Sequence, residues 1–381
     1  PDGGKAPLPV NRLDVPALRM HTSGTGGAPK PIIVSMRSLL INCDAMKRAF
    51  HWGPQTRALT VLPISHANGL VISSFLPWFA GGSSVLLDGF HRSTFWATAR
   101  ETGVTVCSLV PTVMEYLLAD GSDATDQELR AGTLTEIFSG SGPMRPDTAV
   151  EFEQRFTIPV RQLYGLSETS AVLTVTPKVD AGGLSRELRG SIGSEVPHAV
   201  VSVIDPHGVE CASGERGEIV ARGAMLMDGY AGDASATAAA FADGWFHTGD
   251  RGYRRRGPDG HWWFFLEGRL REVIPRAGSA ILPQYVDNVV AGHPAIEQAA
   301  TVGFANRWYG QEVAVYVIPR YSVTEAEILT WCRERLEFAQ QPKVVIFGDE
   351  MPCTAVGKVR RAVLADRLAE QLSSHWESTF R

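Results

Sequence analysis

Short apolar segments alternate with amphipathic segments in the first third of the chain, and this alternation constrains the fold most strongly. Candidate buried strands occur at 58–63, 84–87 and 104–109. Alternating strands and helices are typical of a largely parallel sheet with helices packed on it, so the pattern predicts an α/β fold. The helices expected from apolar spacing span 35–50, 70–79, 94–101 and 112–119.

The pattern of expected strands, helices and turns changes twice further along the chain. From about Ser191, strand candidates are separated by Gly-rich turns, which predicts a more antiparallel β region. After Gly268 and Arg269, strands and helices are interleaved as in a small α+β domain. We therefore expect a large N-terminal domain over 1–269, with mixed and parallel sheets, helices and a small β region, and a smaller domain over 270–381. The strands expected here span 200–204, 218–221, 262–266, 298–304, 312–318 and 343–347, and the helices span 283–290, 325–338 and 359 onward.

Charge and cysteine content argue against several classes of protein. The 381 residues hold 36 Lys and Arg against 41 Asp and Glu, a net charge of −5, whereas nucleic-acid binders usually carry a basic face. The most apolar stretch, 69–82, is interrupted by serines and a proline and is shorter than the ~20 residues that span a bilayer. The five widely spaced cysteines are typical of reduced thiols, so we expect a cytoplasmic protein. Neither a zinc-protease His-Glu-x-x-His motif nor a Gly-x-Ser-x-Gly nucleophile elbow is present.

Residues 22–30 carry the sharpest local signal for anion binding. Three glycines permit positive φ, so consecutive backbone N–H groups can curl around a phosphate, and three hydroxyls add donors. The loop is not a Walker motif, because Pro29 and Pro31 replace the Gly and the Ser/Thr that this motif requires. For the loop alone, a structural Gly/Ser turn is an equal alternative. The candidate phosphate ligands are Thr22, Ser23, Gly24, Thr25, Gly26, Gly27 and Lys30.

Lysine is rare in this chain, so its positions are informative. Six lysines stand against thirty arginines, and Lys30 and Lys358 both lie in Gly-containing loops. A compact ammonium suits a phosphate charge that moves during a reaction. Glu168 could bind magnesium beside nucleotide phosphates, and Asp250, after a Gly turn, could accept hydrogen bonds from a ribose diol. Taken singly, each of these residues is equally compatible with an ordinary turn or surface position.

The order of these segments resembles the motif order of the adenylate-forming (ANL) superfamily, in particular its acyl- and aryl-CoA ligases. The resemblance covers nearly the whole chain. It implies ATP-dependent activation of a carboxylic acid as an acyl-adenylate, followed by transfer to a thiol, with CoA as the expected acceptor and Mg²⁺ as the metal. The matching segments are 22–30, 63–69, 140–143, 164–169, 214–218, 248–250, 268–269 and 352–358.

The resemblance also implies roles for individual residues. Lys358 would bridge the carboxylate of the acid and the α-phosphate, with Ser167 touching that phosphate and Glu168 binding Mg²⁺. The ATP site would comprise the phosphate loop, the adenine-binding residues Gly140, Ser141, Gly142, Gln162, Tyr164 and Gly165, and the ribose-side residues Asp250 and Arg269. His66, Asn68 and Gly69 would lie beside the acid.

By the same resemblance, the C-terminal domain is a mobile lid. It would rotate about a hinge near Arg271, withdraw Lys358 and bring the loop around Gly278 to the site for thioester formation. Several positions depart from the family pattern, namely Gly26, Pro31, Arg271, Pro275 and Tyr285. The departures after residue 270 lie on the face used for the thiol, so they weaken the assignment of the acceptor more than that of adenylation.

Alternatives remain open at this point. The acceptor could be an acyl-carrier protein or an amine instead of CoA, and the chain could be a non-catalytic scaffold relative. Only twenty residues precede His21, whereas family members usually carry an additional upstream subdomain. We expect the apolar surface that such a subdomain would cover to favour a homodimer or an N-terminal partner. The acid itself cannot be named from the sequence.

Overall fold

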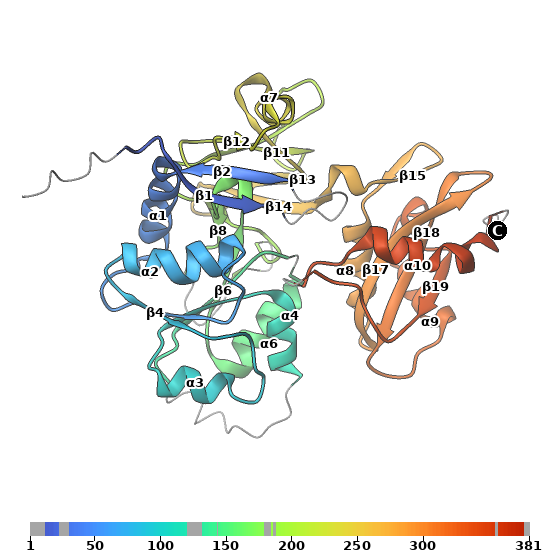
Figure 1. The fold of residues 1–381 in the computed structure, drawn as a ribbon. Coiled ribbons are helices and arrows are strands. Elements are labelled where there is room, and N and C mark those ends of the chain that lie inside the picture. Colours follow the sequence, from blue (N-terminus) through green and yellow to red (C-terminus); the bar gives the residue numbers. More distant parts are fainter. Residues whose placement is uncertain are drawn as a thin grey trace, which may run out of the picture.

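The structure is a computed structural model that describes residues 12–22, 30–119, 132–142, 144–178, 184–185, 188–354 and 357–376 (Figure 1). Its centre is a seven-stranded sheet in the order β4-β3-β5-β6-β7-β8-β9. The first five strands run parallel, as the alternation of strands and helices predicts, and β8 and β9 are antiparallel. The bounds are β3 Arg57–Thr60, β4 Ser83–Leu86, β5 Val106–Leu109, β6 Glu136–Ser139, β7 Val160–Tyr164, β8 Thr174–Val175 and β9 Ser194–Glu195.

Helices cover both faces of this sheet. On one face, Met46 and Leu76 pack with Phe138 of β6, and on the other, Met114 and Phe152 pack with strand residues such as Leu109. The helix expected at 70–79 begins two residues earlier, as a π-helical turn, η1, that continues into α2. The bounds are α1 Met36–Phe50, η1 Asn68–Phe75, α2 Leu76–Phe79, α3 Phe95–Glu101, α4 Pro111–Leu118 and α6 Pro146–Phe156.

Two antiparallel sheets complete the N-terminal part of the molecule, with strand orders β1-β2-β12 and β10-β11-β13-β14. The expected antiparallel region after Ser191 is therefore confirmed. The strand expected at 262–266 extends to Arg269, because β14 remains paired with β13 to that residue. The bounds are β1 Pro16–His21, β2 Pro31–Ser35, β10 Val200–Ile204, β11 Arg216–Arg222, β12 Gly229–Tyr230, α7 Ala234–Ala240, η3 Ala242–Gly244, β13 Phe246–Arg256 and β14 Trp262–Arg269.

A short turn, η4 Leu270–Glu272, leads into a separate five-stranded sheet of order β16-β15-β18-β17, with β19 parallel to β18 (Figure 1, orange and red). The helix expected at 325–338 ends at Arg333, and Glu337 is already extended, with φ −60° and ψ 149°. Within the described residues, no helix has the length and apolar character to cross a membrane. The bounds are β15 Ile274–Arg276, β16 Ser279–Ile281, α8 Pro283–Ala291, β17 Ile296–Asn306, β18 Gly310–Pro319, α9 Glu325–Arg333, η5 Phe338–Gln340, β19 Val344–Phe347 and α10 Arg361–Ser373.

Candidate active site

A cleft of about 1860 Å³ lies between the carboxyl edge of the parallel sheet and the C-terminal domain. It forms there because β5, β6 and β7 are parallel, so the loops that follow them meet at one edge of the sheet. The cleft brings together most of the residues singled out in the sequence. These are Thr22, Lys30, His66, Asn68, Gly140, Ser141, Gly142, Gln162, Tyr164, Gly165, Ser167, Glu168, Asp250, Arg269, Arg271 and Lys358.

Other predicted residues do not line this cleft. Gly69 packs behind it, and a Cβ at this position would lie 2.4 Å from the carbonyl oxygen of Pro63. Gly278 lies in the turn between β15 and β16, with φ 84°, away from the cleft lining. The predicted phosphate ligands Ser23, Gly24, Thr25, Gly26 and Gly27 lie outside the described residues.

A buried carboxylate forms one wall of the cleft. Asp250, on β13, is 3% exposed, accepts a hydrogen bond from the hydroxyl of Tyr164 at 2.8 Å and pairs with Nε of Arg269 at 2.9 Å. Arg269 is the β14 residue directly opposite Asp250, so the antiparallel register itself sets this pair. Burial raises the pKa of Asp250, while Arg269 opposes the increase. The result is an oriented hydrogen-bond acceptor at the cleft wall.

Glu168 and Lys30 are linked through a residue that the sequence reasoning missed. The hydroxyl of Tyr230, on β12, donates to Oε1 of Glu168 at 3.2 Å. Lys30 Nζ lies 5.1 Å from the centre of the Tyr230 ring and 3.9 Å from Asp233 Oδ2. Tyr230 reaches both because β12 pairs with β2, the strand that follows Lys30. Tyr230 therefore contacts both Lys30, through its ring, and Glu168, through its hydroxyl.

The donor set around Glu168 fits magnesium held through a nucleotide. Within the part of the chain that the structure describes, no group of three or more His, Cys, Asp or Glu side chains could hold a metal ion. Magnesium in nucleotide sites usually takes only one or two protein carboxylates and completes its shell with phosphates and water. Tyr230 engages Oε1 of Glu168, so Oε2 can serve as a ligand. Magnesium bound there would neutralise phosphate charge.

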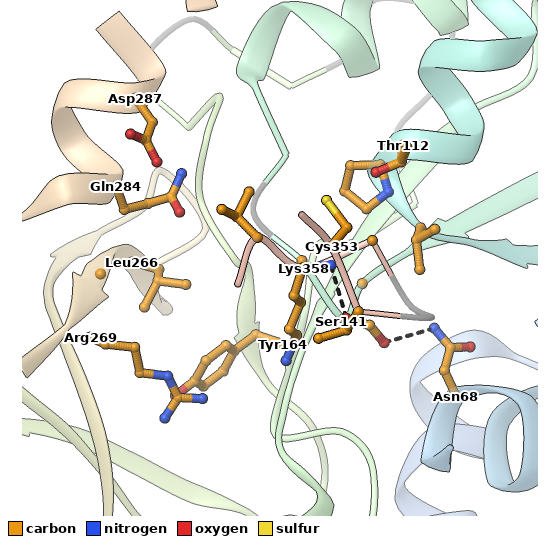
Figure 2. A pocket seen from close by; sticks show the side chains of 18 of the residues that line it. Asn68, Thr112, Ser141, Tyr164, Leu266, Arg269, Gln284, Asp287, Cys353 and Lys358 are labelled. Atoms are coloured by element: carbon orange, nitrogen blue, oxygen red, sulfur yellow. Dashed lines mark hydrogen bonds between the residues drawn. The ribbon is translucent and has the colours of Figure 1, made fainter. Parts of the chain in front are cut away.

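Lys358 enters the cleft from the C-terminal domain, between Tyr164 and Ser141 (Figure 2). Its loop closes on itself, since the Lys358 N–H donates to Thr354 Oγ1 at 3.1 Å and the Thr354 N–H donates to the Lys358 carbonyl at 2.8 Å. Burial lowers the pKa of Lys358, and Arg269 lowers it further, against the opposing effect of Asp250 and Glu168. The ammonium therefore shares one electrostatic site with both carboxylates.

Neutral hydrogen-bonding groups line another part of the cleft. Asn68 is 5% exposed, accepts a hydrogen bond from the Ser108 hydroxyl at 2.7 Å and donates to Ser141 Oγ at 3.3 Å (Figure 2). Ser141 holds a positive φ of 66° at the carboxyl end of β6. Burial and the charge of Lys358 both lower the pKa of His66. This wall therefore offers polar but uncharged groups next to the Lys358 ammonium.

Comparison with known proteins identifies the family to which this geometry belongs. Residues 3–231 match the AMP-binding enzyme family, and residues 285–358 match the AMP-binding enzyme C-terminal domain. The chain belongs to the AMP-binding enzyme family. A sulfoacetate–CoA ligase from Cupriavidus necator is 36% identical over 363 residues, which cover 94% of this chain and 68% of that protein.

Solved structures of AMP-binding enzymes agree with this assignment. The ATP-bound MatB from Rhodopseudomonas palustris superposes with a TM-score of 0.85 at 27% identity, covering 94% of this chain and 69% of that one. The o-succinylbenzoate–CoA synthetase from Bacillus subtilis, in complex with ATP and magnesium, superposes with a TM-score of 0.81 at 27% identity, covering 93% and 71%. The expected membership of the adenylate-forming superfamily, of the acid–CoA ligase type, is confirmed, and the chain is an AMP-forming ligase of this kind.

Some residues that shape this AMP-binding enzyme site could not be recognised in the sequence. Tyr230 is remote in the sequence from Glu168, which it contacts, whereas Thr248 belongs to the matching segment 248–250 but supports Asp250 and Arg269 through contacts that the sequence does not reveal. Thr248 accepts the Asp250 N–H at 3.0 Å, and its carbonyl accepts from Arg269. Thr112, on α4, lies so close to Gly357 that a Cβ on this glycine would be 2.7 Å from its Oγ1. The Gly-Tyr and Thr-Gly-Asp sequences were the only available signals, and both are common in ordinary turns.

The lowered pKa of Lys358 predicts a pH dependence for this AMP-binding enzyme. The protonated lysine is the charged form that can neutralise phosphate, and it is lost as pH rises through the pKa. Because the pKa lies below the ordinary value of 10.5, kcat/KM for ATP should fall at a correspondingly lower alkaline pH. In Lys358→Arg, the fall in kcat/KM should occur at a higher pH, because a guanidinium stays protonated. The maximal rate of this variant should be lower than that of the wild type. Pyrophosphate release measured across a range of pH tests this prediction. If activity fell at the same alkaline pH in both proteins, the titrating group would be one other than Lys358.

Proposed function

We propose that this chain activates a small or medium acyl or aryl carboxylic acid with ATP and Mg²⁺ and transfers the acyl group to CoA. The observation that carries the proposal is the single cleft in which Lys358 of the C-terminal domain shares an electrostatic site with Glu168 and Asp250 of the N-terminal domain. This combination supplies positive charge, a metal ligand and a sugar-binding carboxylate around one reaction centre.

In the first step, a carboxylate oxygen of the acid attacks the α-phosphorus of ATP, and the bond to the bridging oxygen breaks as pyrophosphate leaves. We assign Lys358 to the space between the carboxylate and the α-phosphate, where its ammonium would offset their repulsion. Ser167 would donate to the α-phosphate, and Thr22–Lys30 would hold the departing phosphates. Such steps depend on positioning and charge stabilisation more than on a protein nucleophile.

The nucleoside would lie along the wall formed by Asp250. The Asp250 carboxylate would accept hydrogen bonds from the ribose hydroxyls, with Arg269 supporting the same side. Tyr164 would pack against adenine, and Gln162 or the backbone of 140–142 would read its edge. These assignments are supported by the place of all these residues in the cleft lining and by the orientation of Asp250 through Tyr164 and Arg269.

In the second step, the thiolate of CoA attacks the acyl carbonyl and AMP leaves. We propose that residues 1–269 form the adenylating core and residues 270–381 a lid that rotates about Arg271, so that the Gly278 loop replaces Lys358. The pose described here suits the first step, because Lys358 lines the cleft and Gly278 does not. One lid with two faces can thereby serve two reactions.

The acid is proposed to lie against the wall formed by Asn68, Ser141 and His66. The neighbouring lining includes Ile72 and Val172, which suits the short carbon skeleton of a small acid. CoA is favoured as the acceptor over a carrier protein or an amine, since several similar proteins carry the name CoA ligase. We place the reaction in the cytoplasm, where ATP and CoA are available.

A panel of acids tests the proposal. Pyrophosphate release is measured with each acid and ATP·Mg²⁺, and the acid with the highest activity is then offered CoA, a carrier protein and amines in separate reactions. We expect release with at least one small acyl or aryl acid and thioester formation with CoA. An active enzyme that uses only a carrier protein or an amine would overturn the acceptor assignment. An absence of both release and ATP binding would favour the scaffold alternative.

A further inference from the structure

The two domains are joined by a hydrogen bond at the rim of the cleft. Arg145, the residue that precedes α6, donates through Nη1 to the carbonyl oxygen of Ala291 at 2.6 Å. Ala291 is the last residue of α8 in the C-terminal domain. The last carbonyls of a helix have no partner within the helix and carry its partial negative charge, so a guanidinium is a well-matched donor for them.

The N-terminal domain holds this guanidinium ready for the contact. Arg145 Nε lies 3.2 Å from Glu115 Oε1 on α4, and Thr148 Oγ1 donates to the same carboxylate oxygen at 2.8 Å. The side chains of Arg145 and Glu115 are each 23% exposed. Because its Nε is already directed by Glu115 of α4 and Thr148 of α6, Arg145 gives up little side-chain freedom when the C-terminal domain docks.

The same helix, α4, also receives the loop that carries the lysine. Gly357 directly precedes Lys358, and its φ of 74° and close approach to Thr112 leave no room for a side chain. Thr112 and Glu115 lie three residues apart, on the same side of α4. The Arg145–Ala291 hydrogen bond and the contact of Gly357 with Thr112 thus hold the C-terminal domain at two points, both next to α4.

We infer that Arg145 is a positioning residue that latches the lid in the pose in which Lys358 reaches the cleft. This inference rests on the proposed function. Arg145 acts through the lid and not on the reacting atoms, so it supports acyl-adenylate formation and is dispensable for acyl transfer to CoA. Losing a charged hydrogen bond of this kind should reduce the equilibrium constant for the latched pose by about tenfold.

Arg155, near the end of α6, provides a matched control. Arg155 donates through Nη1 to the carbonyl oxygen of Leu118, the last residue of α4, so that it closes a helix end within the N-terminal domain. Arg145→Ala and Arg155→Ala therefore remove the same side chain and the same kind of bond, and only the first bond crosses between domains. Arg145→Lys retains a donor and should rescue part of the loss.

The first measurement separates the two half-reactions. With the acid of highest activity, we expect Arg145→Ala to slow single-turnover acyl-adenylate formation by up to about tenfold. The rate at which supplied acyl-adenylate reacts with CoA should not change. Arg155→Ala should change neither rate. Equal losses in both half-reactions, or no loss in Arg145→Ala, would overturn the inference.

The second measurement follows the lid and needs no substrate acid. Spin labels are placed at Trp78→Cys in the N-terminal domain and at Trp308→Cys in the C-terminal domain, where the native residues are 66% and 57% exposed. The background variant is Cys353→Ser, because Cys353 is the native cysteine that is exposed. We expect one main interdomain distance, a broadened distribution in Arg145→Ala, and none of this broadening in Arg155→Ala. An unchanged distribution in Arg145→Ala would overturn the latch. A failure of the proposed function would instead appear as a wild-type protein that makes no adenylate.

Discussion

Replacing Lys358 with alanine should reduce acyl-adenylate formation by about two to three orders of magnitude, the usual cost of removing one group that stabilises developing charge. Lys358 is partly buried and lies in a cleft shared with Asp250 and Glu168, so its ammonium contributes to the charge of this site. Acyl transfer from supplied acyl-adenylate to CoA should be nearly unaffected, because that step is assigned to the other face of the lid. Single-turnover formation of the adenylate and of the thioester, measured separately, provides the check.

Lys343→Ala is the matched control for this experiment. Lys343 belongs to the same domain and lies outside the cleft lining, so its replacement removes an equal charge from the lid without touching the site. Both rates should stay close to those of the wild type in this variant. If Lys358→Ala formed the adenylate at the wild-type rate, the assignment of the reacting lysine would be wrong.

Asp250→Asn should weaken ATP binding and destabilise the fold at the same time. The substitution keeps the shape of the side chain but leaves Arg269 beside a neutral amide, and breaking a buried ion pair from one side costs about 3 kcal/mol. The loss of charged hydrogen bonds to the ribose should raise the Kd for ATP at least about tenfold. Urea unfolding with and without ATP, together with calorimetric titration of ATP, measures the two effects.

A double-mutant cycle separates these two effects of Asp250. Arg269→Gln and the double variant Asp250→Asn/Arg269→Gln complete the cycle, and the coupling free energy should account for most of the lost stability. The weaker ATP binding should persist in the double variant, since the ribose has lost its acceptor there as well. An ATP affinity that recovers to the wild-type value in the double variant would contradict a direct contact between Asp250 and the nucleotide.

The central sheet and the two-part organisation could be predicted because they depend on local patterns. Apolar runs of strand length alternate with helical spacing between 58 and 119, and parallel strands place the loops after β5, β6 and β7 at one edge. The rarity of lysine directed attention to Lys30 and Lys358, and the order of the motifs led to the family. These signals require no knowledge of how distant segments pack.

The residues that act across long distances were not predictable in the same way. Tyr230 contacts Glu168 only because β12 pairs with β2, and Arg145 has a partner only because α8 ends beside it. Neither residue carries a periodic or compositional signature. The early end of α9 was also missed, since the helical pattern of the sequence continues past Arg333 while the backbone of Glu337 is extended.

The register of β13 with β14 links the proposed nucleoside site directly to the start of the C-terminal domain. Asp250 and Arg269 face each other across one pair of strands, and the chain leaves this sheet through Leu270–Glu272 immediately afterwards. If the ribose binds at Asp250 as proposed, it contacts the partner strand of β14, and β14 leads directly into the second domain. Among the described residues, the hydrogen bonds between β13 and β14 are thus the only strand pairing that separates Asp250 from the start of the second domain.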